Sequence, residues 1–464
     1  MTNEPVRLGP PPGVRGYRLL AILEPARPRR VADSPRAAML AVATVCIGAF
    51  MGQLDASIVS VALPRMSTEL HVGVGAAEWV SLSYVLVLVA LVVPIGAWAD
   101  SVGRKSLYVG GFAVFTLASG ACAVAPDLAV LCGCRVVQAV GAALMQANSV
   151  ALIASIAPRD RLGRMVGLQA AAQAVGLAAG PAVGGLLLST ASWRLIFLVN
   201  VPAGIIGLAT AATLLPRSRD LAPARHIDLR GVALFVPVVG AALLATSLAT
   251  EGVGWGIVGV TAGAAVGLGA ALVRQQRRTT GPLVKRAVLS AVAIRRGLVA
   301  AFCGYAVLFG TLVVIPIFLT RRSDSPGTVG LLLAALPVGI GIAAPVAGRL
   351  ADRAPSAVAR VGLALTVVAL SALAISQPTG SGLALLLGIV GLGLGAFTPA
   401  NNSSLMLAAP LGSSGAVAGL LNMTRGLGAA AGTALAVLMF TAAGGLAASM
   451  LAFAAIGVVG LLVE

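Results

Sequence analysis

The sequence predicts an all-α membrane protein with fourteen transmembrane helices, arranged as two six-helix bundles with two extra helices between them. Of its 464 residues, 58% are hydrophobic and only 10% are charged, whereas soluble proteins carry about a quarter charged residues. The apolar runs are about twenty residues long, enough for a helix to cross about 30 Å of hydrocarbon. The strands of a membrane barrel would instead show alternating segments of about ten residues.

Fourteen apolar runs mark the expected helices. They cover residues 37–63, 78–99, 106–125, 128–157, 165–189, 194–215, 229–250, 254–273, 298–320, 328–350, 357–376, 381–409, 413–440 and 443–463. The runs divide the chain into four parts: a disordered basic cytosolic tail (1–36), an N-terminal six-helix bundle (37–215), a central linker with two extra transmembrane helices (216–297) and a C-terminal six-helix bundle (298–464). The tail lacks the apolar core of a signal peptide. Because the two central runs are almost purely apolar, we expect them to face lipid.

The basic residues predict how the chain is oriented. Of the 32 Lys and Arg residues, 26 fall in segments that share a side with the N-terminus, and four fall in segments on the other side. Basic residues concentrate on the cytosolic side of membrane proteins. We therefore expect a multi-pass protein of the cytoplasmic (inner) membrane with both termini in the cytosol. The same distribution explains the net charge of +17 without nucleic-acid binding.

A short repeat predicts that the two halves share one architecture, as in transporters built from internal repeats. Residues 96–100 and 348–352 both read Gly-x-x-Ala-Asp, and each ends the second run of its half. A loop carboxylate of this kind holds a helix N-terminus or an arginine of the opposing half. We therefore expect a cytosolic gate built from Gly96, Asp100, Gly103, Arg104 and Asp352.

Asp55 is an acidic residue that we place inside the first run, away from its ends. A carboxylate there costs several kcal/mol unless it is paired, protonated or hydrated. By helix rise, Asp55 lies about 12 Å and Arg135 of the fourth run about 10 Å from the outer ends of their runs. Opposite charges at one depth interact directly or through water, which couples proton binding by Asp55 to the position of Arg135. The alternative role for Asp55 is a structural hydrogen bond.

Polar residues on shared helix faces of the fourth, fifth and thirteenth runs predict a wet substrate cavity. These residues are Gln138, Gln146, Ser149, Gln169, Gln173, Asn422 and Arg425. The alternative for each of them is a hydrogen bond between neighbouring helices.

The fifth run also carries a glycine face that predicts a hinge. Gly176, Gly180 and Gly184 recur every fourth residue, a spacing that lets two helices approach closely. Pro181 removes a backbone hydrogen bond and favours a bend. We expect this face to be both a tight contact and a movable one.

The chain carries no motif for nucleotide or metal chemistry. The loop from Gly96 to Lys105 lacks the Gly-Lys-Ser/Thr of a phosphate loop. Cys132 and Cys134 have no His or acidic cluster nearby to complete a metal site, so we expect them to pack. We expect no catalytic residues, no metal and no cofactor, and hence a protein that is not an enzyme.

Together these motifs resemble those of the fourteen-span drug:proton antiporters of the major facilitator superfamily, over nearly the whole chain after residue 36. The segments that carry the resemblance are Leu54 to Pro64, Gly96 to Lys105, Arg135 to Ala143, Gly176 to Gly185, and Trp193 to Phe197 with Asn200, Pro202 and Gly204.

The chain departs from the family's usual motifs at four positions. Ser57 and Ser60 stand where Thr and Asn are usual in the first span, and Ala139 stands where Gly is usual in the fourth. Ser101 stands where the superfamily's loop usually has Arg, which weakens the expected gate.

The resemblance implies proton-coupled efflux by alternating access, with a proton gradient as the energy source. Asp55 and Arg135 take the proton-coupling roles, and Gly180 and Pro181 the hinge. No acid occupies the tenth run, where relatives that take divalent cations carry one, so a hydrophobic or monocationic drug-like or antibiotic molecule is the implied substrate. The expected partners are this small molecule, protons and the lipid bilayer, with no nucleic acid and a monomeric chain. The alternatives are a facilitator or importer of a small nutrient and a non-transporting membrane receptor or scaffold.

Overall fold

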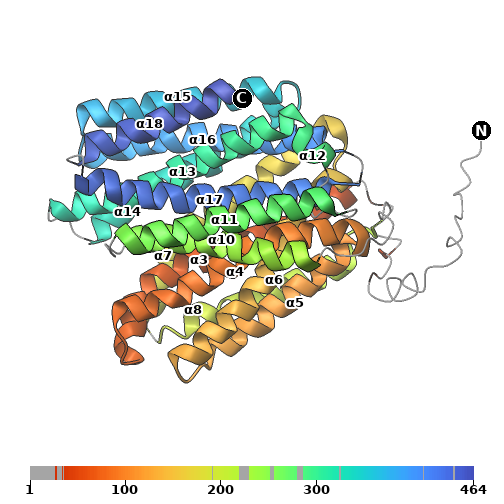
Figure 1. Cartoon of the computed structure of the whole chain (residues 1–464), viewed down its shortest axis with the longest axis horizontal. Coiled ribbons are helices and arrows are strands. Elements are labelled where there is room, and N and C mark those ends of the chain that lie inside the picture. The colour runs from red at the N-terminus through yellow and green to blue at the C-terminus, as the bar shows by residue number, and fades with distance from the viewer. Residues whose placement is uncertain are drawn as a thin grey trace, which may run out of the picture.

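The computed structural model of the chain is all-α (Figure 1). It describes residues 24, 27–28, 34, 36–190, 192–218, 229–250, 255–279, 286–322, 326–410, 412–442 and 445–464. Within these ranges, twelve helical segments are long and apolar enough to cross a membrane. They are α3 (Ala37–Glu69), α4 (Val74–Val102), α5 (Arg104–Ala123), α6 (Leu128–Ile156), α7 (Leu162–Thr190), α8 with α9 (Leu195–Leu198 and Asn200–Leu214), α13 (Val292–Arg321), α14 (Pro326–Ala351), α15 (Pro355–Ser376), α16 (Gly380–Ala408), α17 (Ser414–Ala442) and α18 (Leu446–Val463).

Apolar side chains cover the outside of the helices as well as filling the inside. Phe112, Trp193 and Phe453 are fully buried, whereas Ile375 and Leu462 are 82% and 80% exposed. Lipid accepts such a surface, and it forces every backbone polar group into intrahelical hydrogen bonds. The lipid environment therefore explains both the apolar composition and the helical fold.

The helices form two bundles, α3 to α9 and α13 to α18 (Figure 1). The bundles meet chiefly through two helix pairs, α4 with α17 and α7 with α14. In each pair the second span of one half packs against the fifth span of the other. Glycines allow these crossings, because a Cβ on Gly96 would collide with the backbone of Gly415, and one on Gly163 with the backbone of Gly348.

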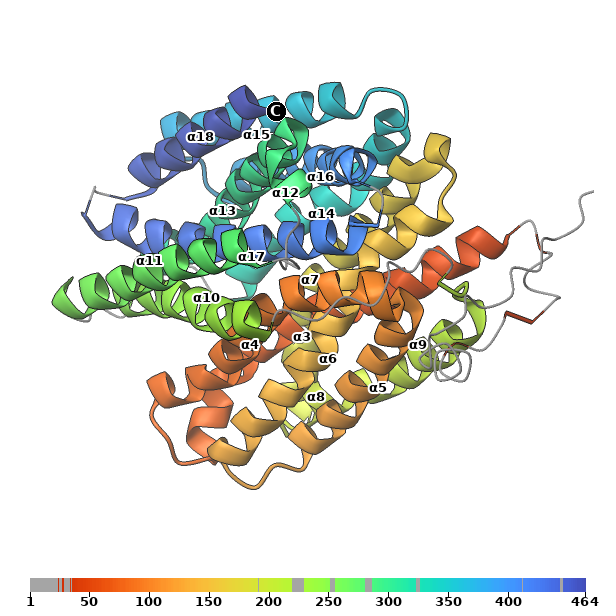
Figure 2. The ribbon, with the colours of Figure 1, turned by 45° about the vertical axis from the view of Figure 1, so that its right-hand side comes forward.

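Two further helices, α10 (Leu229–Thr250) and α11 (Trp255–Arg278), join the bundles. Figure 2 shows α10 and α11 side by side, and α10 packs against α4 and α17. The expectation that both central helices simply face lipid is therefore incomplete: α10 bridges one helix of each bundle, while α11 exposes apolar residues such as Val260 and Val266. Neither helix is among the twelve candidate spans found in the described part of the chain.

The boundary between the central linker and the C-terminal bundle differs from the one expected. Helix α13 begins at Val292, after the short α12 (Arg286–Ser290), so the expected boundary between residues 297 and 298 falls inside a helix. The predicted tail, 1–36, lies almost wholly outside the described residues. Glu24 is described and buried: its carboxylate accepts hydrogen bonds from the backbone N–H of Ser106 and of Ser218.

The glycine face of α7 packs against α3, the helix that carries Asp55. A Cβ on Gly176 would collide with the carbonyl oxygen of Phe50, and one on Gly180 with the hydroxyl of Ser57. A Cβ on Gly184 would lie 3.0 Å from the side chain of Ile58. Pro181, by contrast, lies on the exposed side of the helix. The structure thus accounts for the tight contact, and the hinge stays a prediction.

The substitution Gly180→Leu tests this contact, because its side chain has no space beside Ser57. We expect overpacking to cost about 1–3 kcal/mol and to lower the melting temperature of the purified protein. Gly185→Leu is the matched control, since a Cβ on Gly185 meets nothing within 4 Å. Equal melting temperatures for the two variants would contradict the assigned packing.

Candidate functional site

Asp55 of α3 and Arg135 of α6 form an ion pair inside the N-terminal bundle. Arg135 Nη1 lies 2.7 Å from Asp55 Oδ2, and the side chains of Arg135 and Asp55 are 1% and 0% exposed. The structure therefore brings together the two charges that the sequence places at one depth. In a low-dielectric interior each charge needs the other, because an unpaired buried ion costs several kcal/mol.

A shell of neutral polar groups completes the hydrogen bonding of this pair. Asp55 Oδ1 accepts from Gln138 Nε2 at 3.0 Å and from Asn200 Nδ2 at 2.9 Å. Arg135 Nη1 also donates to Gln138 Oε1, and Arg135 Nε donates to the carbonyl oxygen of Val80. Gln138 Nε2 further donates to Ser119 Oγ at 2.8 Å. The network thus ties together α3, α4, α5, α6 and α9.

Tyr84 separates the ion pair from the space between the bundles. The Arg135 guanidinium carbon lies 4.1 Å from the centroid of the Tyr84 ring and 5.6 Å from that of Phe197. Tyr84 also lines the central cavity, whereas neither Asp55 nor Arg135 does. In this conformation the ion pair lies outside the cavity wall, with the Tyr84 ring between Arg135 and the cavity.

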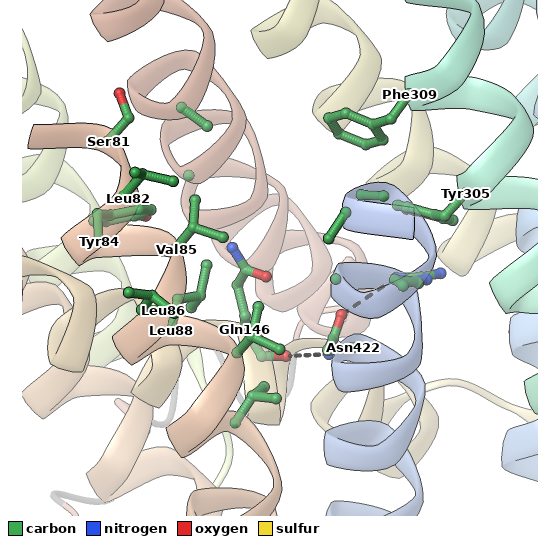
Figure 3. Close-up of a pocket in the computed structure, with 18 of the residues that line it drawn as sticks. Ser81, Leu82, Tyr84, Val85, Leu86, Leu88, Gln146, Tyr305, Phe309 and Asn422 are labelled. Atoms are coloured by element: carbon green, nitrogen blue, oxygen red, sulfur yellow. Dashed lines mark hydrogen bonds between the residues drawn. The ribbon is translucent and has the colours of Figure 1, made fainter. Parts of the chain in front are cut away.

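A cavity of about 380 Å³ lies between the two bundles. Figure 3 shows Tyr84, Leu82 and Val85 of α4 on one side of it, and Tyr305 and Phe309 of α13 on the other. Leu244 of α10 also lines it, so one central helix belongs to the cavity wall. Small-molecule sites have volumes of about 300–1,000 Å³ and mostly apolar walls.

Four of the seven polar residues predicted for the cavity line it: Gln146, Gln173, Asn422 and Arg425. Asn422 Nδ2 donates to the carbonyl oxygen of Gln146 at 2.9 Å, which joins the two bundles across the cavity (Figure 3).

The structure places the other three residues, Gln138, Ser149 and Gln169, outside the wall of this cavity. Gln138 belongs to the ion-pair network, and Gln169 Nε2 donates to Ser149 Oγ at 2.9 Å inside the N-terminal bundle. All three side chains are buried among helices of one bundle, so the hydrogen-bonding alternative holds for them.

Asp100 joins the bundles at the end of the molecule where α4 meets α17. Its carboxylate accepts hydrogen bonds from the backbone N–H of Gly415 at 3.0 Å and of Ala416 at 3.3 Å. Arg104 Nη2 donates to Asp100 Oδ1 and to Ser414 Oγ. Asp100 therefore caps the N-terminus of α17, where free amides and the helix dipole favour a negative charge. Gly103 permits the turn between α4 and α5 with a φ of 108°.

Asp352 makes the corresponding contact in the other direction. Its Oδ1 accepts from the backbone N–H of Gly163 at 2.6 Å and of Arg164 at 3.3 Å, at the N-terminus of α7. Burial raises the pKa of the Asp352 carboxyl, and these two hydrogen bonds oppose the rise. Both repeated aspartates thus cap the second and third residues of a helix in the opposite bundle. We call these two contacts the latches, and the end of the molecule that holds them the latch end.

Both ends of the helical core lie at the latch end. Ala37, the first residue of α3, lines a pocket with Asp100 and Arg104. Glu464 follows α18 and lies within electrostatic reach of Arg360 near the start of α15. An even number of crossings produces this arrangement.

Within the described ranges, no group of three or more His, Cys, Asp or Glu side chains is placed to hold a metal ion. Cys132 and Cys134 are partly buried and packed against the core around Trp193 and Phe197.

Sequence reasoning missed the part of two residues in the ion-pair network: Asn200 donates to Asp55, and Tyr84 covers Arg135. In the C-terminal bundle, Arg425 Nη2 donates to Asn402, which lies in a polar break of the apolar run 381–409, at 2.5 Å. The signal for Asn200 and Asn402 is an amide inside an apolar run. Tyr84 gives no such signal, since aromatic residues are ordinary core residues.

The chain is similar to known membrane transporters. The family model described as Major Facilitator Superfamily matches residues 45–228 and 229–433. The chain is 31% identical to Uncharacterized transporter YebQ of Escherichia coli (strain K12), over 86% of this chain and 88% of that protein. It is 31% identical to Multidrug resistance protein Stp of Mycobacterium tuberculosis (strain CDC 1551 / Oshkosh), over 86% and 75%. It is 30% identical to Riboflavin transporter RibZ of Clostridioides difficile (strain 630), over 84% and 85%.

Two solved structures share the fold. The human organic anion transporter MFSD10 (TETRAN) aligns with a TM-score of 0.69 at 14% identity, over 93% of this chain and 100% of that one. The proton:xylose symporter XylE aligns with a TM-score of 0.61 at 15% identity, over 92% and 94%. At such low identity the likeness concerns the fold alone.

The substitution Asp352→Asn tests the latches. An amide caps α7 without the charge, so we expect a loss of about 1 kcal/mol and an about fivefold larger population with separated bundles. Spin labels at Arg161→Cys and Arg353→Cys, in a variant with the five native cysteines replaced, report this population as longer electron–electron distances. Asp160→Asn is the control, because it makes the same change in charge at an exposed position near the same latch. An unchanged distance distribution in Asp352→Asn would contradict the latch role.

Proposed function

Because the chain belongs to the Major Facilitator Superfamily, a family of membrane transporters rather than enzymes, we propose that it exports hydrophobic drug-like molecules in exchange for protons. One observation carries the proposal: a fully buried carboxylate, Asp55, is paired with an arginine one aromatic ring away from a drug-sized cavity. Ionisable residues inside a membrane commonly mark proton relays. The relative Stp, a multidrug resistance protein, supports export of drugs.

Asp55 is the proton acceptor in this mechanism. Protonation removes the charge that holds Arg135, and the desolvated guanidinium then needs another arrangement of partners. Arg135 already donates to Val80 of α4 and lies against Tyr84 of the same helix. A shift of Arg135 therefore moves α4 relative to α3. This movement opens the site and carries the change toward the cavity.

The latches set the two end states of alternating access. With both latches formed, the latch end is closed, and substrate exchanges on the other side. Opening both latches exposes the cavity at the latch end. Basic residues such as Arg104, Arg164 and Arg353 lie at this end, so we propose that it faces the cytosol. The chain then collects its substrate from the cytosol and releases it outside the cytoplasmic membrane.

We also propose that α10 and α11 cross the membrane, which gives the fourteen spans of the drug:proton antiporters. Their 22 and 24 residues are long enough to cross about 30 Å of hydrocarbon. The lining role of Leu244 supports the place of α10 beside the cavity.

A second candidate function is import or facilitated passage of a small nutrient. The relative RibZ, a riboflavin transporter, favours it. Counterflow of a labelled nutrient in proteoliposomes without a pH gradient separates this candidate from proton-driven export.

Asp55→Asn tests proton coupling in inverted membrane vesicles with an imposed pH gradient. Asn keeps the shape and cannot cycle a proton, so we expect gradient-driven accumulation to fall to the level of vesicles without the protein. The transported molecules are Nile red (neutral), ethidium (cationic) and pyrenebutyrate (anionic). Glu69→Gln is the control, because it removes an acid from the partly exposed end of the same helix.

Two outcomes would contradict the proposal. Unchanged accumulation in Asp55→Asn would remove the proton role from this residue. If the imposed pH gradient drives accumulation of none of the three molecules by the wild-type protein, the export of hydrophobic compounds is contradicted.

A further inference from the structure

We propose that the cavity selects hydrophobic molecules with a single negative charge, and that Arg425 of α17 binds that charge. This substrate class rests on the proposed transport function and narrows it. The shared chemistry is a carboxylate on an apolar body, whether the molecule is dissolved in water or resident in the membrane.

Arg425 supplies the one formal charge among the described residues that line the cavity. The other polar lining groups are neutral, such as Gln146, Gln173 and Asn422. The Arg425 side chain is only 5% exposed, so water solvates little of its charge. A desolvated cation of this kind is costly until an anion approaches it.

The partners of Arg425 do not neutralise it. Nη2 donates to Asn402 Oδ1 and Nη1 to Asn422 Oδ1 at 3.3 Å, and both acceptors are neutral amides. None of the ion pairs found among the described residues includes Arg425. Its Nε is buried and has no hydrogen-bond partner. A guanidinium has five donors in a planar fork, which matches the two oxygens of a carboxylate.

Arg425 differs from Arg135 in having no carboxylate partner from the chain. Both arginines are buried inside the membrane-spanning region, and both lie against a tyrosine ring: Tyr84 for Arg135 and Tyr305, at 5.0 Å, for Arg425. Arg135 has a carboxylate partner from the chain, Asp55, and lies outside the cavity wall. Arg425 lies in the cavity wall without one. The chain therefore neutralises one interior arginine and leaves the other open to a ligand.

The remaining walls define the rest of the substrate. Val85, Val89 and Phe309 present apolar surface, and the volume of about 380 Å³ accommodates a drug-sized body. A monocation in this space meets a like charge, which disfavours the monocationic substrate expected from the sequence. A neutral molecule leaves the guanidinium uncompensated, so an apolar monoanion satisfies the site best.

Equilibrium binding to the purified protein in nanodiscs tests this inference without a proton gradient. Pyrenebutyrate, pyrenebutanol and pyrenemethylamine share one aromatic body and differ in charge. We expect pyrenebutyrate to bind most tightly and pyrenemethylamine most weakly. Pyrenehexadecanoate distinguishes a membrane-resident substrate from a dissolved one. Tighter binding of pyrenehexadecanoate than of pyrenebutyrate would identify the substrate as a membrane-resident fatty acid, and weaker binding would identify it as a dissolved carboxylate.

Two variants assign the charge recognition to Arg425. Arg425→Gln removes charge-assisted hydrogen bonds, so its affinity for pyrenebutyrate should fall about 10- to 100-fold while that for pyrenebutanol changes little. Arg425→Lys keeps the charge without the fork and should bind pyrenebutyrate with intermediate affinity. Arg360→Gln, at an exposed position of α15, is the control with the same change in net charge.

The inference and the proposed function fail in different ways. Tighter binding of pyrenemethylamine than of pyrenebutyrate by the wild-type protein would overturn the anion preference, and this ranking requires no variant to fold. An unchanged pyrenebutyrate affinity in Arg425→Gln would also overturn it. Either result leaves proton-driven export intact, because export depends on Asp55.

Discussion

The buried pair of Asp55 and Arg135 is the interaction on which the rest of the structure depends. A buried ion pair adds little net stability, because the desolvation penalty of the two charges offsets their attraction. If one charge is lost, the desolvation penalty of the other is no longer compensated. The pair draws donors and acceptors from α3, α4, α5, α6 and α9 into one network. In the proposed mechanism, a single proton on Asp55 therefore changes the arrangement of all five helices.

Two helices connect this network to the latch end. Helix α4 carries Val80 and Tyr84 at the ion pair, then the cavity wall at Val89, and holds the latch residue Asp100 in its last turn. Helix α7 packs its glycine face on α3, and its N-terminus receives the cap from Asp352. In the proposed mechanism, a movement at the ion pair reaches both latches through these two helices. The internal repeat explains why there are two latches: each half supplies one aspartate and one capped helix.

Much of this arrangement could be predicted from the sequence, because a membrane makes position along a helix equivalent to depth. Equal depth predicted that Asp55 meets Arg135, and the repeated Gly-x-x-Ala-Asp predicted corresponding contacts at residues 100 and 352. Apolar runs predicted the helices because lipid excludes other structures.

The sequence did not predict equally well which residues of each helix face the cavity. Gln146 and Ser149 are three residues apart on α6, yet one lines the cavity and the other bonds to Gln169. Which residue faces the cavity depends on how α6 is rotated against its neighbours, and one helix alone does not contain that information. The position of α10 was missed for the same reason, since an apolar composition does not reveal the helices it contacts.

The most direct test of the account measures the latch end while Asp55 titrates. Spin labels on opposite bundles at the latch end, followed by electron–electron distances over a range of pH, report whether proton binding separates the bundles. The account predicts longer distances at low pH in the wild-type protein, and in Asp55→Asn a distribution already shifted to longer distances that no longer follows pH. The same pH response in both proteins would contradict the claim that a proton on Asp55 drives the movement.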